Sequence, residues 1–208
     1  LKGRFGTISS GWDFFTAWKG IESEFEKNPD KTELELLTKG VFQKERLIDI
    51  VQNFILFEKE KERLVKKMAR YQQMRATNKI VERVVTKEKR QGLIWHTQGS
   101  GKTLTMYFTA WKLRFNKLLT NPKVFILVDR VDLDDQIFET FINCGGQNVE
   151  RAISRKDLEE KIQSSTSGIY ITTIQKFSEL GKDIENLNEN VIILSDEAHR
   201  GNEGKSGI

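Results

Sequence analysis

The chain has 208 residues, which is enough for one principal domain with an appendage. Its 34 Lys and Arg slightly outnumber its 30 Asp and Glu, so the net charge of +4 permits a polyanionic partner without requiring one. With 38% hydrophobic residues and 2 prolines, the composition is that of a folded domain and excludes collagen-like and linker-like chains. No apolar run approaches the roughly 20 residues of a membrane-spanning helix.

The only cysteine, Cys144, can form no internal disulfide. We therefore expect a reducing compartment, the cytoplasm, and no contact with a membrane. The chain opens on Leu1 and stops in a Gly-rich, polar stretch, from which we expect a fragment of a larger protein.

The first 90 residues are rich in charge and in helix-forming residues. One amphipathic helix is predicted by apolar side chains at helical spacing, namely Leu47, Ile48, Ile50, Val51 and Phe54. A second is expected at residues 69–85, and the dense charge run at residues 58–67 is interpreted as a solvated helix face or a linker. We predict a mostly helical linker region at residues 1–65 and the principal domain at residues 66–208. Four early aromatic residues are expected to pack in a core rather than to stack on bases: Trp12, Phe14, Phe15 and Trp18.

Farther along the chain, short apolar runs alternate with amphipathic stretches. The runs predict strands at residues 92–95, 124–128, 168–172 and 191–194. Helices are predicted between them at residues 103–119, 133–142 and 175–180. This alternation predicts an α/β fold with a parallel sheet, in which ligands bind beyond the carboxyl ends of the strands.

The strongest local pattern is Gly99-Ser100-Gly101-Lys102-Thr103, between the first of these strands and a helix. Small residues let backbone N–H groups approach a polyphosphate, and the start of a helix adds unsatisfied donors and the positive end of its dipole. Lys102 would place its charge at the β and γ phosphates of ATP, and the Thr103 hydroxyl would bind Mg²⁺. The pattern thus predicts a phosphate loop, although the full form has Gly where this chain has His96. The alternative is a Gly-rich turn that only caps a helix.

Two adjacent acids, Asp196 and Glu197, directly follow the apolar run at residues 191–194. Neighbouring side chains diverge at a strand end, so the two carboxylates can take different roles. Asp196 would hold Mg²⁺ through a water molecule, and Glu197 would polarise the water that attacks the γ phosphate. Alone, such a pair can be a helix N-terminal charge, but a phosphate loop upstream favours catalysis.

With these motifs the chain resembles the DEAH-box form of superfamily 2 helicases and translocases. The glycine loop resembles motif I, and Asp196-Glu197-Ala198-His199 resembles motif II. Further segments resemble one family in that group, the restriction subunit of type I restriction-modification enzymes. These are residues 95–98, 128–133 with Gln136, 171–177, 196–200 and, in the amino-terminal part, residues 39–42 and 45–57.

The resemblance implies a RecA-like parallel sheet with helices on both faces, in the first lobe of an ATP-driven motor. The motor would translocate along duplex DNA before a separate nuclease domain cleaves it, in a complex with methyltransferase and specificity subunits. The resemblance also implies that His199 couples the hydrolytic site to the neighbouring lobe. Arg130, Thr172 and Thr173 would contact the DNA backbone without regard to sequence. For Arg130 a buried ion pair remains the alternative.

In the superfamily, a glutamine upstream of the loop reads adenine. Its carboxamide can donate to one atom of the adenine edge and accept from another. By its spacing Gln73 is the better match and Gln72 the fallback, while two surface glutamines on a polar helix are the alternative.

We expect the full-length protein to be an ATP-dependent type I deoxyribonuclease with a DNA-dependent ATPase. The fragment alone should hydrolyse ATP poorly, because the second lobe that supplies arginine fingers lies outside it. Two other functions remain open. One is another superfamily 2 motor, from type III restriction or repair, and the other is a nucleotide-binding scaffold that does not hydrolyse ATP.

Overall fold

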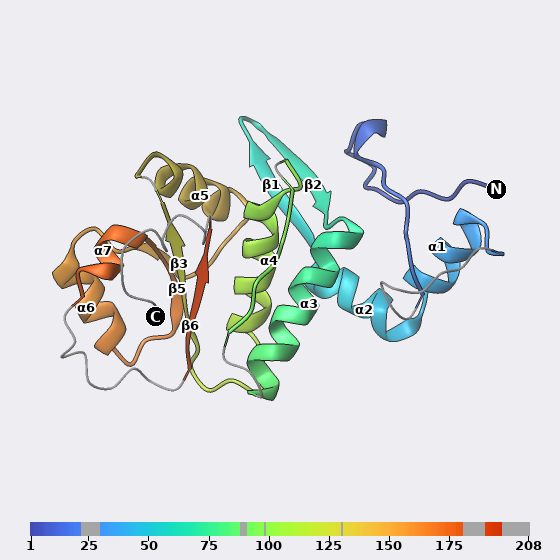
Figure 1. Ribbon diagram of the computed structural model, residues 1–208. Coiled ribbons are helices and arrows are strands. Elements are labelled where there is room, and N and C mark those ends of the chain that lie inside the picture. Colours follow the sequence, from blue (N-terminus) through green and yellow to red (C-terminus); the bar gives the residue numbers. More distant parts are fainter. Residues whose placement is uncertain (22–29, 88–90, 98, 130, 181–189, 197–208) are drawn as a thin grey trace.

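The computed structural model describes residues 1–21, 30–87, 91–97, 99–129, 131–180 and 190–196 (Figure 1). A four-stranded sheet with its helices makes up one end of the molecule in this view, and the amino-terminal segment lies at the other end. A two-stranded hairpin and two long helices, α3 and α4, lie between them.

The four-stranded sheet is parallel throughout, in the order β4-β5-β3-β6. Its strands are β3 (Lys123–Val128), β4 (Val149–Arg151), β5 (Gly168–Thr173) and β6 (Val191–Ser195). Helices connect these strands, as a parallel arrangement requires. Their carboxyl ends therefore meet at one edge, and the predicted α/β fold is confirmed.

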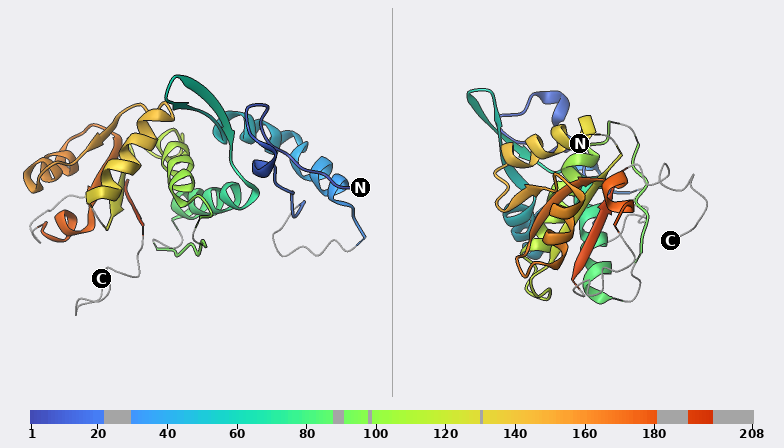
Figure 2. Two further views of the ribbon diagram at one scale, coloured as in Figure 1. Left: turned by 90° about the horizontal axis from the view of Figure 1, so that it is seen from above. Right: turned by 90° about the vertical axis from the view of Figure 1, so that its left-hand side faces the viewer.

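Both faces of the sheet are covered by helices, because alternate side chains of the buried central strand point to opposite sides. On one face Val124, Ile126 and Val128 join a cluster with α3 (Tyr71–Thr86), α4 (Lys102–Arg114) and α5 (Val131–Asn143). On the other, Phe125 and Leu127 pack against α6 (Arg155–Gln163) and α7 (Ile174–Ser178). The left panel of Figure 2 shows α6 and α7 across the sheet from α3 and α4.

The strand predicted at residues 92–95 is absent from the structure, so this prediction is wrong. The described residues 91–97 form neither helix nor strand, and the side chains of Leu93 and Trp95 are 76% and 87% exposed. An apolar run becomes a strand only where a neighbouring strand completes its hydrogen bonds. No described strand pairs with this run. Gln91 and Gly92 border the same pocket as β6, but β6 is an edge strand that pairs only with β3. The sequence analysis also missed β4 and α6, which are short and largely polar.

Residues 58–67 form most of a β-hairpin, so the predicted helix face or linker is wrong. The hairpin consists of β1 (Ile55–Glu60) and β2 (Arg63–Met68). Because side chains alternate between the faces of a strand, Glu58 and Glu60 share one face with Lys67. The Lys67 ammonium pairs with both carboxylates, at 2.7 Å from Glu60. The alternating charges therefore form cross-strand ion pairs in place of the i,i+4 pairs of a helix.

The amino-terminal part contains the predicted helical segments α1 (Glu33–Val41) and α2 (Lys44–Asn53). A capping box between Thr32 and Glu35 begins α1. The predicted amphipathic helix is confirmed as α2, which buries Ile50.

The predicted core packing of the early aromatic residues is confirmed for Trp18 and wrong for Trp12 and Phe14. Trp18 is 4% exposed, whereas Trp12 and Phe14, in the 3₁₀ turn η1 (Trp12–Phe14), are 72% and 62% exposed. A bridge between Phe5 and Thr16 closes the loop that carries this turn. The loop leaves these two rings outside the core.

The predicted boundary between residues 65 and 66 falls inside β2. The buried cluster is continuous across it, since Trp18, Ile50 and Leu56 belong to the same cluster as Phe108 and Val124. The amino-terminal part therefore packs directly on the sheet-bearing part.

The turn of the hairpin provides a test of this local structure. Lys61 adopts a φ of 55°, whereas Glu62 beside it does not have a positive φ. Lys61→Gly is expected to raise the free energy of unfolding by roughly 0.5–1 kcal/mol, because glycine takes a left-handed conformation without strain. Glu62→Gly should lower it by a similar amount, because there glycine only adds freedom to the unfolded chain. Urea unfolding of both variants measures the difference, and equal destabilisation by the two would contradict the turn geometry.

Candidate nucleotide-binding site

The glycine loop makes a tight turn directly into α4. Gly99 and Gly101 have φ values of 74° and 83°, which L side chains rarely adopt. Gly101 is the N-cap residue of α4, and its carbonyl accepts the first helical hydrogen bond, from the Thr105 N–H at 3.1 Å. Lys102 and Thr103 are thus the first two residues of the helix. The residues chosen from the sequence as the phosphate loop do take up the loop-to-helix conformation that such a loop needs.

The start of α4 offers hydrogen-bond donors to an anion. No side chain caps the helix at Gly101, so its first turn relies on other acceptors for its backbone N–H groups. The Ser100 hydroxyl oxygen is buried and has no hydrogen-bond partner in the described part of the chain. A buried hydroxyl without a partner is costly, and a phosphate oxygen would provide one. The residues present therefore fit a polyphosphate group.

Gln73 connects this loop to the start of α3. Its side-chain nitrogen donates to the Gly101 carbonyl at 3.0 Å, and its side-chain oxygen accepts from the Arg70 N–H at 2.7 Å. A methyl group on Gly101 would lie 2.5 Å from the Gln73 nitrogen. Gln73 is 3% exposed, whereas Gln72 points to solvent, so the glutamine at the loop is the one favoured by spacing. One donor and one acceptor of the Gln73 carboxamide are left over for a ligand.

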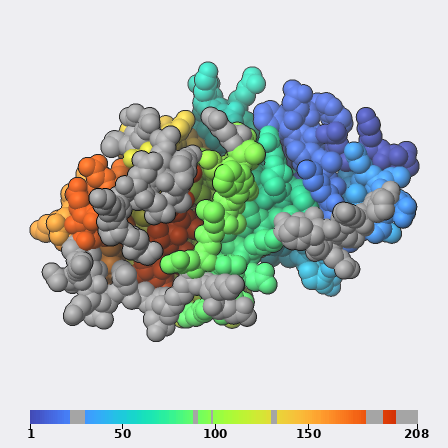
Figure 3. Space-filling model, in the orientation of Figure 1, coloured from blue at the N-terminus to red at the C-terminus, as the bar shows by residue number. Residues whose placement is uncertain are grey.

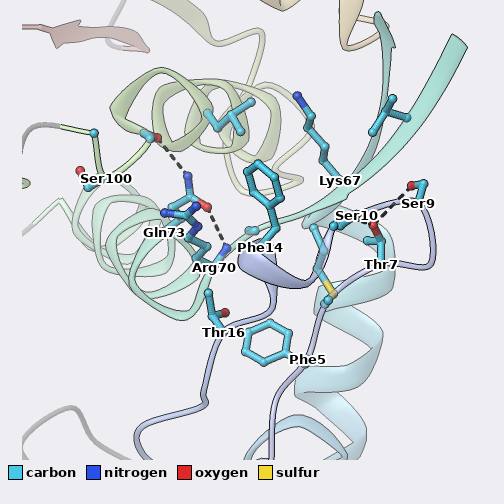
Figure 4. A pocket seen from close by; sticks show the side chains of 18 of the residues that line it. Phe5, Thr7, Ser9, Ser10, Phe14, Thr16, Lys67, Arg70, Gln73 and Ser100 are labelled. Carbon is cyan, nitrogen blue, oxygen red and sulfur yellow. Dashed lines mark hydrogen bonds between the residues drawn. The ribbon is translucent and has the colours of Figure 1, made fainter.

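A cavity of about 330 Å³ lies beside the loop, at the meeting point of the amino-terminal segment, the hairpin and α3 (Figure 4). The space-filling view shows the blue amino-terminal segment alongside the teal hairpin and the green α3 (Figure 3). The cavity is bordered by Gly99, Ser100 and Gly101 of the loop, by Arg70 and Gln73 of α3, and by apolar and aromatic side chains that include Phe14, Val65, Met68 and Leu104. The sequence analysis missed Arg70 and Phe14, because no local pattern places either residue beside the loop.

Asp196 directly follows β6, and its backbone N–H donates to the Leu127 carbonyl of β3 at 2.9 Å. It is half-buried at the carboxyl edge of the sheet. In Figure 1 the first turn of α4 lies at the same end of the molecule as this edge. It does not border the cavity beside the glycine loop. Glu197 and His199, predicted as water-polarising and coupling residues, lie outside the described residues. The structure thus brings Asp196 to the expected edge and leaves the roles of the acids as predictions.

Two of the three candidate DNA contacts lie in the described part of the chain, and both are buried. Thr172 is 0% exposed, and Thr173 is 5% exposed with its hydroxyl accepting from the Lys176 N–H at the start of α7. The burial of both hydroxyls by α7 and the sheet argues against DNA contacts from them in this conformation. Arg130 lies outside the described residues.

His96 occupies the position where the full phosphate-loop pattern has glycine. Burial lowers the pKa of the His96 imidazole, and the charge of Lys102 lowers it further. Both causes favour the neutral ring next to the start of α4. A neutral imidazole adds no charge of its own to this region.

The fold and the loop geometry agree with a comparison against known families. Residues 72–207 match the family model described as "SWI2/SNF2 ATPase". The chain belongs to this ATPase family. The match begins in α3, one residue before Gln73, and includes the glycine loop and the acidic residues Asp196 and Glu197 that follow β6 in the sequence.

Within that class, the chain is similar to endonuclease subunits of type I restriction enzymes. It is 37% identical to the HindI endonuclease subunit of Haemophilus influenzae over 97% of this chain and 21% of the relative. It is 34% identical to the putative MjaIXP endonuclease subunit of Methanocaldococcus jannaschii over 98% of this chain and 22% of the relative. The carboxyl-terminal part of a putative MpnIIP endonuclease subunit from Mycoplasma pneumoniae is 31% identical over 78% of this chain and 84% of the relative. The resemblance stated from the motifs is confirmed, and the chain spans about a fifth of the length of the first two relatives.

The pKa of His96 reports on the placement of Lys102. Lys102→Ala is expected to raise this pKa, because it removes the charge and leaves only burial to lower it. A folded-state pKa below the ordinary value of 6.5 means that the folded protein binds fewer protons than the unfolded chain. The free energy of unfolding of the wild type should therefore fall as the pH drops from 6.5 toward the pKa of His96 in the folded protein. The fall should be smaller in Lys102→Ala.

Both effects can be measured by NMR titration of the histidine rings and by unfolding at several pH values. His199→Asn assigns the two histidine signals. Lys117→Ala, an exposed lysine beyond the other end of α4, is the matched control and should leave the His96 pKa unchanged. An identical His96 pKa in the wild type and Lys102→Ala would contradict the nearness of the two side chains.

Proposed function

We propose that the chain binds MgATP as the first motor lobe of a type I restriction subunit, in which ATP hydrolysis drives translocation along duplex DNA before endonucleolytic cleavage. The observation that carries this proposal is the glycine loop. It turns through two positive-φ glycines into the start of α4, beside a buried Ser100 hydroxyl that has no hydrogen-bond partner among the described residues. The family match and the likeness to type I endonuclease subunits support the choice of motor.

The roles of the residues follow from their positions. Backbone N–H groups of the loop and of the first turn of α4 would bind the phosphates, and Lys102 would offset their negative charge. Thr103 and, through a water molecule, Asp196 would hold Mg²⁺, which supplies charge neutralisation at the β and γ phosphates. Glu197 would accept a proton from the water that attacks the γ phosphate in line with the leaving oxygen. His199 would couple this site to the neighbouring lobe.

The whole protein's partners are proposed on the same basis. The relatives are named as subunits of type I restriction enzymes, and so we propose assembly with methyltransferase and specificity subunits around duplex DNA. The DNA contacts would be independent of sequence. The candidates are Arg130 and the two threonines Thr172 and Thr173, whose side chains are buried in this conformation.

The proposed compartment is the cytoplasm. Cys144 is a buried free thiol, which suits a reducing environment. No described helix combines the length and the apolar character that a membrane span requires.

Binding of nucleotide can be tested by titrating a fluorescent ATP analogue against this chain. Binding should require magnesium, and Lys102→Ala should weaken it about tenfold or more, because the ammonium charge offsets phosphate repulsion. Lys117→Ala is the control, since this exposed residue lies beyond the opposite end of α4. Equal affinities of the wild type and Lys102→Ala would rule out the proposed phosphate site.

Hydrolysis can be tested by Glu197→Gln in the full-length protein, which should reduce DNA-stimulated ATPase activity about 10²-fold or more while ATP still binds. Glu139→Gln, at an exposed position on α5, is the control and should keep full activity. Unaltered activity of Glu197→Gln would refute the catalytic assignment. A wild-type protein that binds ATP without any DNA-stimulated turnover would favour the non-hydrolysing scaffold. A protein with DNA-stimulated activity that does not copurify with methyltransferase and specificity subunits would favour another superfamily 2 motor.

A further inference from the structure

The loop that carries Phe14 is held in place on the hairpin. The backbone N–H groups of Phe5 and Thr16 each donate to the carbonyl of the other residue at 3.0 Å, which closes the loop. The Thr7 and Ser9 hydroxyls donate to the Lys66 carbonyl at 2.5 and 2.9 Å, and the Lys66 N–H donates to the Ser9 hydroxyl oxygen at 2.9 Å. These bonds fix the loop on β2, at the side of the cavity opposite the glycine loop.

Phe14 has an open ring within this loop. The ring is 62% exposed. None of the aromatic pairs among the described residues includes it. Other aromatic rings of this segment do have ring partners. Trp12 stacks on Phe15 with ring centroids 5.1 Å apart. Trp18 packs edge-on against Phe5 and Tyr71. An exposed aromatic face bordering a cavity offers a surface on which a planar ligand can stack.

The cavity that Phe14 borders has the composition of a small-molecule site. Figure 4 shows the Phe14 ring in the middle of the lining residues, with Gln73 and Arg70 on one side and Lys67 on the other. Its volume of about 330 Å³ lies within the range of ligand pockets, roughly 300–1,000 Å³. The walls combine apolar side chains with a few polar groups, and one wall is the glycine loop itself. A ligand with phosphates on that loop would place its remaining part in this cavity.

We propose that the cavity binds the base of the nucleotide, and that the Phe14 ring stacks on the face of that base. This proposal rests on the proposed binding of ATP at the glycine loop. Gln73 would contact the edge of the base with the one donor and the one acceptor that its bonds to Gly101 and Arg70 leave over, and stacking by Phe14 would add a contact to the face of the base. The amino-terminal segment, outside the matched ATPase region of residues 72–207, would thus contribute to nucleotide affinity.

The test compares two ligands in the full-length protein, MgATP and magnesium tripolyphosphate, by calorimetry or by competition with a fluorescent ATP analogue. Phe14→Ala should weaken ATP binding about tenfold and leave tripolyphosphate binding unchanged, because only ATP has a base to stack. Phe14→Trp should retain the affinity for ATP, whereas Phe14→Leu, of similar bulk but without an aromatic face, should resemble Phe14→Ala. Trp12→Ala is the matched control, since it removes an exposed ring of the same turn that does not border the cavity.

Each outcome decides between the two proposals. An ATP-to-tripolyphosphate affinity ratio of Phe14→Ala equal to that of the wild type overturns the stacking proposal, and so does a loss of the same size in Trp12→Ala. Lys102→Ala should weaken both ligands, and its failure to do so would refute the phosphate site independently of Phe14. If Phe14→Ala is unstable, the comparison of Phe14→Trp with Phe14→Leu gives the same answer.

Discussion

The candidate site depends on one side chain, the carboxamide of Gln73. It bonds to the Arg70 N–H at the start of α3 and to the Gly101 carbonyl at the start of α4. These two bonds connect the beginnings of α3 and α4, two of the three helices that pack on one face of the sheet. Gly101 must remain a glycine for two reasons, because its φ is positive and because a methyl group would collide with Gln73. The contact therefore sets where the loop lies and which residues border it.

The parallel sheet supplies the second constraint on the site. Because all four strands run in the same direction, the residues that follow them lie at one edge, and the bond from the Asp196 N–H to the Leu127 carbonyl fixes the end of β6 against β3. The threonines at the end of β5, Thr172 and Thr173, are buried at the same edge. The end of β6 thus carries a candidate ligand-binding residue, whereas the end of β5 is used for packing.

The hairpin links the amino-terminal segment to the nucleotide site. Opposite charges share one face of the hairpin, so that Lys67 pairs with Glu58 and Glu60 beside the cavity. Its backbone at Lys66 receives the loop that carries Phe14. Segments that are far apart in the sequence thus border one cavity, and the amino-terminal part is a component of the candidate site.

The sequence by itself determined the α/β class, the glycine loop at the start of a helix and the family, because these depend on local periodicity and on residue types at short spacing. It also placed Gln73 at the start of α3, and this placement is confirmed. Only the tertiary structure decided that residues 58–67 form a hairpin, that residues 92–95 form no strand and that Phe14 borders the loop. The physical reason is the same in each case. Whether an apolar or charged run becomes a strand, and whether an aromatic ring stays exposed, depends on hydrogen bonds and contacts with partners that are distant in the chain.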